Sequence, residues 1–136
     1  MTKRVLRMAK SIHTHLMFEG SCEEALDLYV SVFPNSEITD ITRFEEGDHV
    51  GKVMIASCMI NGTKVTAIDS PQPHDFTFTP SMSFFVDCES EDALKSVFKK
   101  LSEGGTVRMP IDNYGFSKLF GWIDDKFGVS WQLNLT

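Results

Sequence analysis

The feature that most constrains the fold is an order of secondary-structure signals that occurs twice along the 136 residues. In the first half, a β-rich run at Ile12–Phe18 precedes a helical apolar period that begins after Ser21 and ends at Pro34. Three strand-like runs then follow, at Glu37–Phe44, Val50–Ile60 and Thr63–Asp69. Asn61-Gly62 predicts a hairpin turn between the last two runs, because both residue types tolerate positive φ.

The second half begins the same order again. A strand is predicted at Ser81–Asp87, and Ser90 then begins a helix that ends before Gly104-Gly105. Three further strands are predicted, at Thr106–Met109, Phe116–Ile123 and Val129–Leu135. Few identities match between the halves, so chance remains open for the individual residues, and the repeated order of elements is the stronger argument for a duplication.

These elements predict an α+β fold made of two βαβββ modules within a single domain, 1–136. The first module spans 12–69, and the second spans 81–135. Residues 70–80 contain three prolines without periodicity and are interpreted as a linker. A ferredoxin-like split βαβ is the competing fold, but it has two strands between its helices, where this sequence predicts three before the second module begins.

The composition excludes several classes of function. The net charge is −6 and no basic stripe is present, so no nucleic-acid partner is expected. That charge either favours neutral or cationic ligands or simply reflects solubility. No apolar run can span a membrane and Met1–Met8 has no apolar core, so no membrane association, no signal peptide and a cytoplasmic location are expected. The three cysteines form no C-x-x-C pair, which argues against a disulfide framework or a zinc knuckle.

Three parts of the chain resemble a known family. They are Phe18–Ala25 with Tyr29–Ser36, Leu101–Gly105, and Phe120–Trp122 with Asp125–Leu133. These parts resemble the PhnB-like branch, also labelled 3-demethylubiquinone-9 3-methyltransferase-like, of the vicinal-oxygen-chelate superfamily of glyoxalases, bleomycin-resistance proteins and dioxygenases. The resemblance implies a cup-shaped mixed sheet with the helices on its convex side, and a homodimer.

In the metal enzymes of that superfamily, each module contributes ligands from its first and last strands. The resemblance assigns those four positions to His13, Thr66, Ser81 and Gln132. Of these, the imidazole alone is a strong ligand, because neutral hydroxyl and amide oxygens bind divalent transition metals poorly. No cofactor is therefore expected, and a divalent metal held by His13 and Gln132 remains the alternative.

Strand alternation assigns further side chains to the same faces as these positions. The predicted ligand-binding residues are His13, His15, Met17, Thr66, Ser81, Ser83 and Gln132. The opposite faces carry apolar residues such as Leu16, Phe18, Met82 and Phe84, which are expected to pack under the helices. The alternative is that the polar faces merely contact solvent, as in any antiparallel sheet.

The resulting prediction is a protein that binds a small, partly apolar organic molecule in the cup between the modules. The alternatives are a metal-dependent lyase, isomerase or dioxygenase acting on vicinal oxygens, with His13 or His15 as base or ligand, and a structural role through a dimer surface. Methyl transfer from an adenosyl donor is not expected, because Gly104-Gly105 follows a helix and so does not form the Gly-rich strand-to-helix loop that such donors usually require.

Overall fold

The computed structural model describes residue 6 and residues 8–136, and the chain divides into two compact units. Unit 1 extends to Val30 and includes Pro34–Pro71, and unit 2 comprises Ser31–Phe33 and Gln72–Thr136. Most of Met1–Met8, on which the signal-peptide argument rests, lies outside the described residues. Within the described part of the chain, no helix is both long and apolar enough to cross a bilayer.

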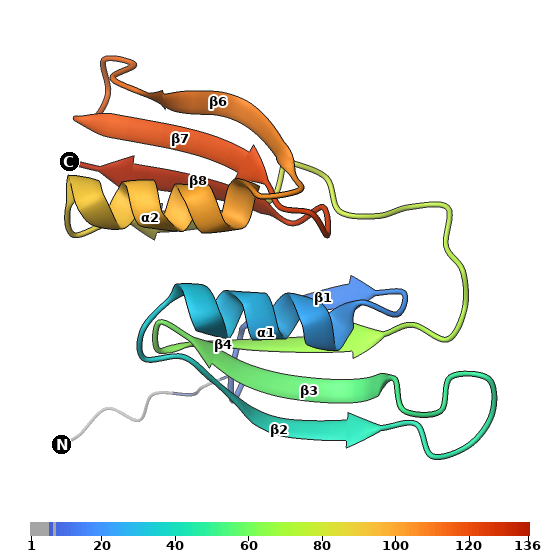
Figure 1. Ribbon diagram of the computed structural model, residues 1–136. Helices are drawn as coiled ribbons and strands as arrows, with labels where there is room; N and C mark the ends of the chain where they lie inside the picture. The colour runs from blue at the N-terminus through green and yellow to red at the C-terminus, as the bar shows by residue number, and fades with distance from the viewer. Residues whose placement is uncertain (1–5, 7) are drawn as a thin grey trace, which may run out of the picture. The chain divides into compact units, whose positions relative to one another are not determined.

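Unit 1 contains one mixed four-stranded sheet. The elements of the first module are β1 (Thr14–Phe18), α1 (Cys22–Val32), β2 (Glu37–Arg43), β3 (Val53–Ile60) and β4 (Thr63–Asp69). The strand order is β1-β4-β3-β2, in which β1 pairs with β4 in parallel and the other pairs are antiparallel (Figure 1).

Unit 2 repeats this topology. Its elements are β5 (Phe84–Asp87), α2 (Glu91–Ser102), β6 (Thr106–Asp112), β7 (Leu119–Asp124) and β8 (Ser130–Leu135). The strand order is β5-β8-β7-β6, again with one parallel pair, β5 with β8. Each strand of unit 1 therefore has an equivalent in unit 2, which confirms the predicted α+β fold of two βαβββ modules.

Local sequence explains where the elements begin and turn. Ser90 accepts a hydrogen bond from the Ala93 amide at 3.1 Å, which confirms the predicted cap of α2. Asn61 and Gly62 have φ values of 50° and 80° and form the predicted two-residue hairpin between β3 and β4. Gly128, with a φ of 91°, occupies the equivalent hairpin between β7 and β8.

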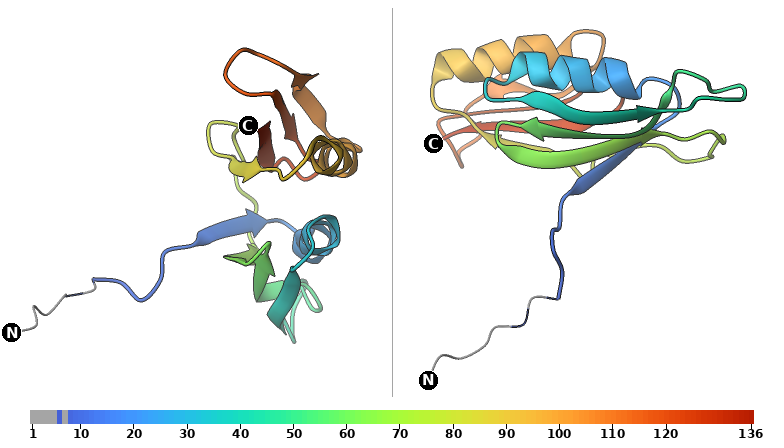
Figure 2. Two further views of the ribbon diagram at one scale, coloured as in Figure 1. Left: turned by 90° about the vertical axis from the view of Figure 1, so that its left-hand side faces the viewer. Right: turned by 90° about the horizontal axis from the view of Figure 1, so that it is seen from below.

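Each helix covers one face of the sheet in its own module, as Figures 1 and 2 both show. Within α2, the buried positions Leu94, Val97 and Leu101 recur at helical spacing. Along β1, the buried residues Leu16 and Phe18 alternate with more exposed ones, as a sheet covered on one face requires, whereas the central strand β4 is buried continuously from Val65 to Ala67. Among the largest fully buried side chains are Trp131, Tyr29, Leu26, Leu94, Leu101, Ile123 and Leu133.

Several predicted strand boundaries differ from the structure, among them the start of β3 at Val53 rather than Val50. The strand β6 continues through Pro110 to Asp112, because it lies at the sheet edge, where the missing amide of proline costs no ladder bond. The next strand begins at Leu119 rather than at Phe116, after a loop. In the second module, β5 begins only at Phe84, so Met82 lies before the strand and is 76% exposed rather than packed under a helix.

Candidate functional site

A row of polar residues crosses the sheet of unit 1. His15, Thr66, Ser57 and Asp40 are successive register partners on β1, β4, β3 and β2. His15 Nδ1 and Thr66 Oγ1 are 2.7 Å apart and share a hydrogen bond. Successive side chains of a strand point to opposite faces, so Thr66, which is also buried, lies opposite the buried residues Val65 and Ala67, and with His15 it occupies the face of the sheet that the helix does not cover. We call this the helix-free face.

The equivalent row in unit 2 has a different chemistry. Phe85, Gln132, Trp122 and Met109 are register partners on β5, β8, β7 and β6. Gln132 donates from Nε2 to Ser83 Oγ at 3.0 Å, which leaves the Ser83 hydroxyl hydrogen and Gln132 Oε1 able to bind another group. The row of unit 2 therefore combines aromatic surface with one amide–hydroxyl pair.

The structure thus joins some predicted site residues and separates others. It brings His15 to Thr66 and Ser83 to Gln132. His13 is exposed and precedes β1, and its Nδ1 lies 3.0 Å from Ser11 Oγ. Ser81 precedes β5, and its Oγ lies 2.9 Å from Thr79 Oγ1. Met17 is half-buried on β1, two residues beyond His15.

Phe85 of this row also belongs to a group of four aromatic side chains in unit 2. We call this group the aromatic cluster: Phe85, Tyr114, Phe116 and Phe120. Phe120 is buried at its centre, with the rings of Phe116, Tyr114 and Phe85 at centroid distances of 4.9, 6.2 and 6.4 Å. Phe85 and Phe116 are 56% and 63% exposed. The Tyr114 hydroxyl donates to Pro110 O at 2.6 Å, which fixes its ring.

Sequence reasoning did not predict this cluster. Tyr114 and Phe116 lie in the loop between β6 and β7, where residue spacing does not predict the direction of a side chain. The sequence contains 11 Phe residues, and this abundance is the signal from which exposed aromatic side chains could have been suspected.

The donor chemistry around the four predicted metal positions does not fit a glyoxalase-type metal ion. Thr66 and Ser81 offer hydroxyl oxygens and Gln132 a neutral amide, and each of these side chains already shares a hydrogen bond with a protein neighbour. Within residues 6 and 8–136, no group of three or more His, Cys, Asp or Glu side chains is placed to hold a metal.

The cysteines near the start of α1 are chemically quiet. Burial, followed by the nearby charge of Asp69, raises the pKa of the Cys22 thiol from 9.0 to about 12. Burial also raises the pKa of the Cys58 thiol to about 11. Both thiols are therefore protonated near neutral pH and are poor nucleophiles.

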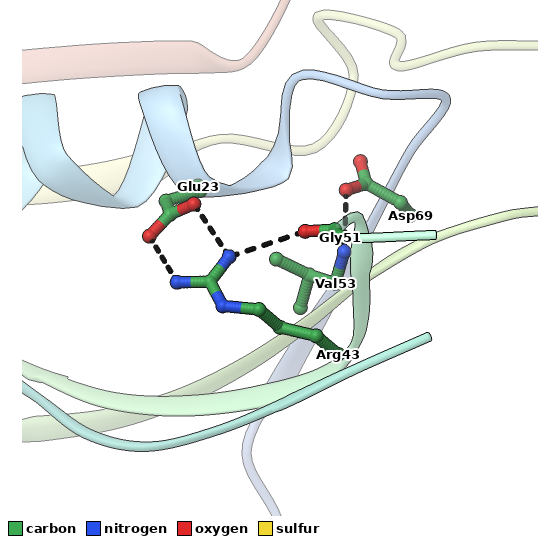
Figure 3. A network of polar contacts seen from close by, with 5 residues as sticks. All are labelled: Glu23, Arg43, Gly51, Val53 and Asp69. Carbon is green, nitrogen blue, oxygen red and sulfur yellow. Dashed lines mark hydrogen bonds and ion pairs between the residues drawn. The ribbon is translucent and has the colours of Figure 1, made fainter. Parts of the chain in front are cut away.

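Asp69 organises the start of α1 and one end of the sheet in unit 1. Its Oδ1 accepts from the amides of Gly20 and Cys22 at 2.8 and 2.9 Å, and its Oδ2 accepts from the Val53 amide at 3.0 Å. Figure 3 shows the Val53 contact. A carboxylate beside the first amides of a helix is favourable for both hydrogen bonding and the helix dipole. Asp69 follows Val65 and Ala67 on the buried face of β4. A carboxylate at a position where the alternation predicts a buried apolar residue indicates a structural role, a signal that was missed in the sequence.

Arg43 connects the same region to the β2–β3 loop. Its guanidinium donates to the two carboxylate oxygens of Glu23 at 2.7 and 2.6 Å and to Gly51 O at 3.2 Å (Figure 3). The Arg43 guanidinium lowers the pKa of the Glu23 carboxyl, mainly through their hydrogen bond. These contacts lie at the surface and orient the loop rather than form a reactive site.

Asp125 plays a comparable part in unit 2. Its Oδ1 accepts from the Phe127 and Val129 amides at 2.9 and 3.1 Å, and its Oδ2 accepts from the Trp131 indole at 2.9 Å. The run Asp125–Gln132, which carried much of the family resemblance, is thus a turn followed by the start of β8, in which the aspartate of the turn accepts a hydrogen bond from the tryptophan of the strand. Its structural role explains the motif without assigning a reaction to it.

Comparison with solved structures identifies the fold first. A glyoxylase/bleomycin resistance protein/dioxygenase domain from Frankia superposes with a TM-score of 0.67 over 95% of this chain and 98% of its own, at 13% identity. At that identity the match shows that the two chains share a fold.

Closer relatives then define the family. The profile of the 3-demethylubiquinone-9 3-methyltransferase family matches residues 10–134, and the chain belongs to this PhnB-like family. The PhnB protein from Bacillus cereus is 48% identical over 93% of this chain and 100% of its own, with a TM-score of 0.91. Protein PA1353 from Pseudomonas aeruginosa is 26% identical over 93% and 98% of the two chains, with a TM-score of 0.81. A search of curated proteins finds none that matches.

Proposed function

We propose that this PhnB-like protein binds a small, partly apolar organic molecule on the helix-free face of its sheets and does so without a glyoxalase-type metal ion. The observation that carries the proposal is the exposed aromatic surface of Phe85 beside the Gln132–Ser83 pair. Binding sites for small molecules combine apolar and aromatic walls with a few well-placed polar groups, and this face has both.

The exposed rings are the part of this face that solubility alone does not explain. Single exposed apolar residues are ordinary, whereas adjacent ones mark surfaces that bind something. Phe85 and Phe116 are each more than half exposed and flank the same buried ring, that of Phe120. Unit 1, taken by itself, carries His15, Thr66 and Met17, the polar and thioether groups that were predicted as ligand contacts.

The donor set supports the metal-free part of the proposal. A divalent ion at these positions would have one imidazole and no carboxylate among His13, Thr66, Ser81 and Gln132. Methyl transfer from an adenosyl donor is also left out of the proposal, although the family name refers to it. The two strand-to-helix connections, residues 19–21 and 88–90, contain one glycine between them, Gly20.

A thermal-shift screen of a library of small organic molecules tests the binding proposal, with native mass spectrometry to establish stoichiometry. We expect Phe85→Ala to abolish the shifts that the wild type shows. Phe76→Ala is the matched control, because Phe76 is 59% exposed but lies outside the aromatic cluster. If no molecule stabilises the wild type, or if both variants lose binding equally, the proposal is wrong.

Metal analysis after purification in mixed divalent ions tests the metal-free part. We expect no stoichiometric metal. A full equivalent of metal that is lost in His13→Ala would instead support the lyase, isomerase or dioxygenase alternative. The predicted homodimer is checked separately by light scattering coupled to size-exclusion chromatography.

A further inference from the structure

Arg108 lies on the helix-free face of unit 2 because of an irregularity in β6. The register of β6 with β7 shifts between Val107 and Met109, and Arg108, which lies between them, has no register partner. A β-bulge of this kind turns the side chain of the extra residue, and bulges are frequent beside binding sites. The guanidinium reaches Asp124 and the ring of Trp122, which lie on the same face of β7 because they are two residues apart.

Asp124 and Trp122 hold that guanidinium in one orientation. Arg108 Nε and Nη2 both contact Asp124 Oδ2, at 2.7 and 2.6 Å, and the guanidinium carbon lies 6.0 Å from the centre of the Trp122 ring. Trp122 is itself fixed by a hydrogen bond of 2.7 Å from its indole to Ser130 Oγ. A cation over an indole ring is electrostatically favourable, so the orientation is reinforced from two sides.

This geometry leaves the outer edge of the guanidinium available. Asp124 uses the edge formed by Nε and Nη2, whereas Nη1 makes no hydrogen bond to another described residue. The side chain is 37% exposed. The edge formed by Nη1 and Nη2 has the shape that binds a carboxylate through two parallel hydrogen bonds.

The aromatic cluster lies one strand period away from this cation. Phe120 and Trp122 are neighbours on one face of β7, and residues two apart on a strand are separated by roughly 7 Å. Gln132 is the register partner of Trp122, and Phe85 is the register partner of Gln132. An apolar ring surface, an amide–hydroxyl pair and an oriented cation therefore follow one another on a single face.

We propose that the ligand of this face is an aryl carboxylate, with its ring on the aromatic cluster and its acidic group on Arg108. This inference rests on the proposed function and adds the chemical class of the ligand. The overall charge of −6 repels anions, so a preference for an acid over its neutral analogue reports a local contact rather than the general field of the protein.

Three probes that differ by one feature each test the proposal: 4-phenylbutanoate, 4-phenylbutanamide and heptanoate. In both aryl probes a flexible chain of three methylene groups joins the ring to the polar group. We expect the wild type to bind the aryl acid about tenfold more tightly than the amide, as one hydrogen-bonded charge contact typically provides. Heptanoate, which lacks the ring, should bind more weakly than the aryl acid. The dissociation constants are measured by NMR titration at low salt.

Variants assign the preference to the named residues. Arg108→Gln should remove the preference for the acid while amide binding remains, and Phe116→Ala should weaken both aryl ligands. Arg43→Gln is the matched control, since Arg43 is also an exposed arginine paired with one carboxylate, but in unit 1. Circular dichroism verifies folding, and if Arg108→Gln does not fold, Arg108→Lys replaces it and should reduce the preference, because its ammonium lacks the planar edge.

The outcomes separate this inference from the proposed function. Equal affinity of the wild type for the acid and the amide, or a preference that survives in Arg108→Gln or disappears in Arg43→Gln, overturns the aryl carboxylate assignment and leaves small-molecule binding intact. A wild type that binds none of the probes and nothing in the library overturns both. Loss of the preference in Arg108→Gln alone supports the assignment.

Discussion

Replacing Asp69 by alanine should destabilise unit 1 far more than its single carboxylate suggests. The Asp69 side chain accepts hydrogen bonds from three backbone amides, those of Gly20, Cys22 and Val53. The contacts with Cys22 and Val53 are buried, whereas that with Gly20 is partly buried and water can replace it. Alanine would therefore leave two buried amides without an acceptor.

The magnitude follows from those two amides. A buried donor that loses its partner costs about 1–3 kcal/mol, so Asp69→Ala should reduce the free energy of unfolding by about 2–6 kcal/mol. That loss is a large part of the roughly 5–15 kcal/mol typical of a folded protein. Asp69→Asn should cost less, about 1–3 kcal/mol, because its oxygen still accepts from the helix while its NH₂ group opposes the Val53 amide.

Urea unfolding followed by far-UV circular dichroism measures these differences. Tryptophan fluorescence is unsuitable, because Trp122 and Trp131 both lie in unit 2. Asp40→Ala, at an exposed position on β2, is the control and should change the free energy of unfolding by less than about 0.5 kcal/mol. An Asp69→Ala protein as stable as this control would refute the reasoning, and so would an asparagine variant less stable than the alanine variant.

Two further predictions concern the thiols and a close backbone contact. In the folded protein the pKa values of Cys22 and Cys58 are about 12 and about 11, above the 9.0 expected for an unfolded thiol. The contribution of these thiols to stability is therefore present below pH 9 and is lost as the pH rises through the folded values. Urea midpoints measured from pH 8 to 11 should therefore fall less steeply in a Cys22→Ala, Cys58→Ala double variant, and an equal slope would contradict this. Gly105→Ala should lower the melting temperature strongly, since the new Cβ would lie 2.2 Å from Asp124 O, whereas Gly47→Ala meets nothing within 4 Å and bears only the strain of its φ of 84°. Similar melting temperatures for the two variants would contradict the contact.

The fold was predictable because its determinants are local. The Asn61-Gly62 turn and the Ser90 cap each depend on residues within a few positions, and both were read correctly from the sequence. The duplication was found because each module repeats the same order of such local elements. The errors lie where position in the sheet overrides local preference, as at Pro110, which an edge strand tolerates.

The candidate site was less predictable because its contacts depend on register and loops. The sequence placed Thr66 and Gln132 at equivalent strand positions, but their first-strand partners in register are His15 and Phe85, two and four residues beyond the predicted His13 and Ser81. Arg108 was missed because strand alternation cannot predict the face of a residue in a bulge. Asp69 was missed because its hydrogen-bond partners are 16, 47 and 49 residues away in sequence.

The two modules share one topology but carry different chemistry on their helix-free faces. Within each module, buried residues such as Asp69, Asp125 and Trp131 make hydrogen bonds that hold a turn or the start of a helix in place. The register rows on the helix-free faces differ in their side chains: one is polar around His15, and the other is aromatic around Phe85. The four positions that the resemblance assigns to metal ligands hold one imidazole and three neutral oxygen donors, so the shared topology alone does not carry a metal or its reaction to this chain. The ligand is decided by the side chains of the rows, and the exposed rings and the oriented guanidinium of unit 2 are the groups from which it must be inferred.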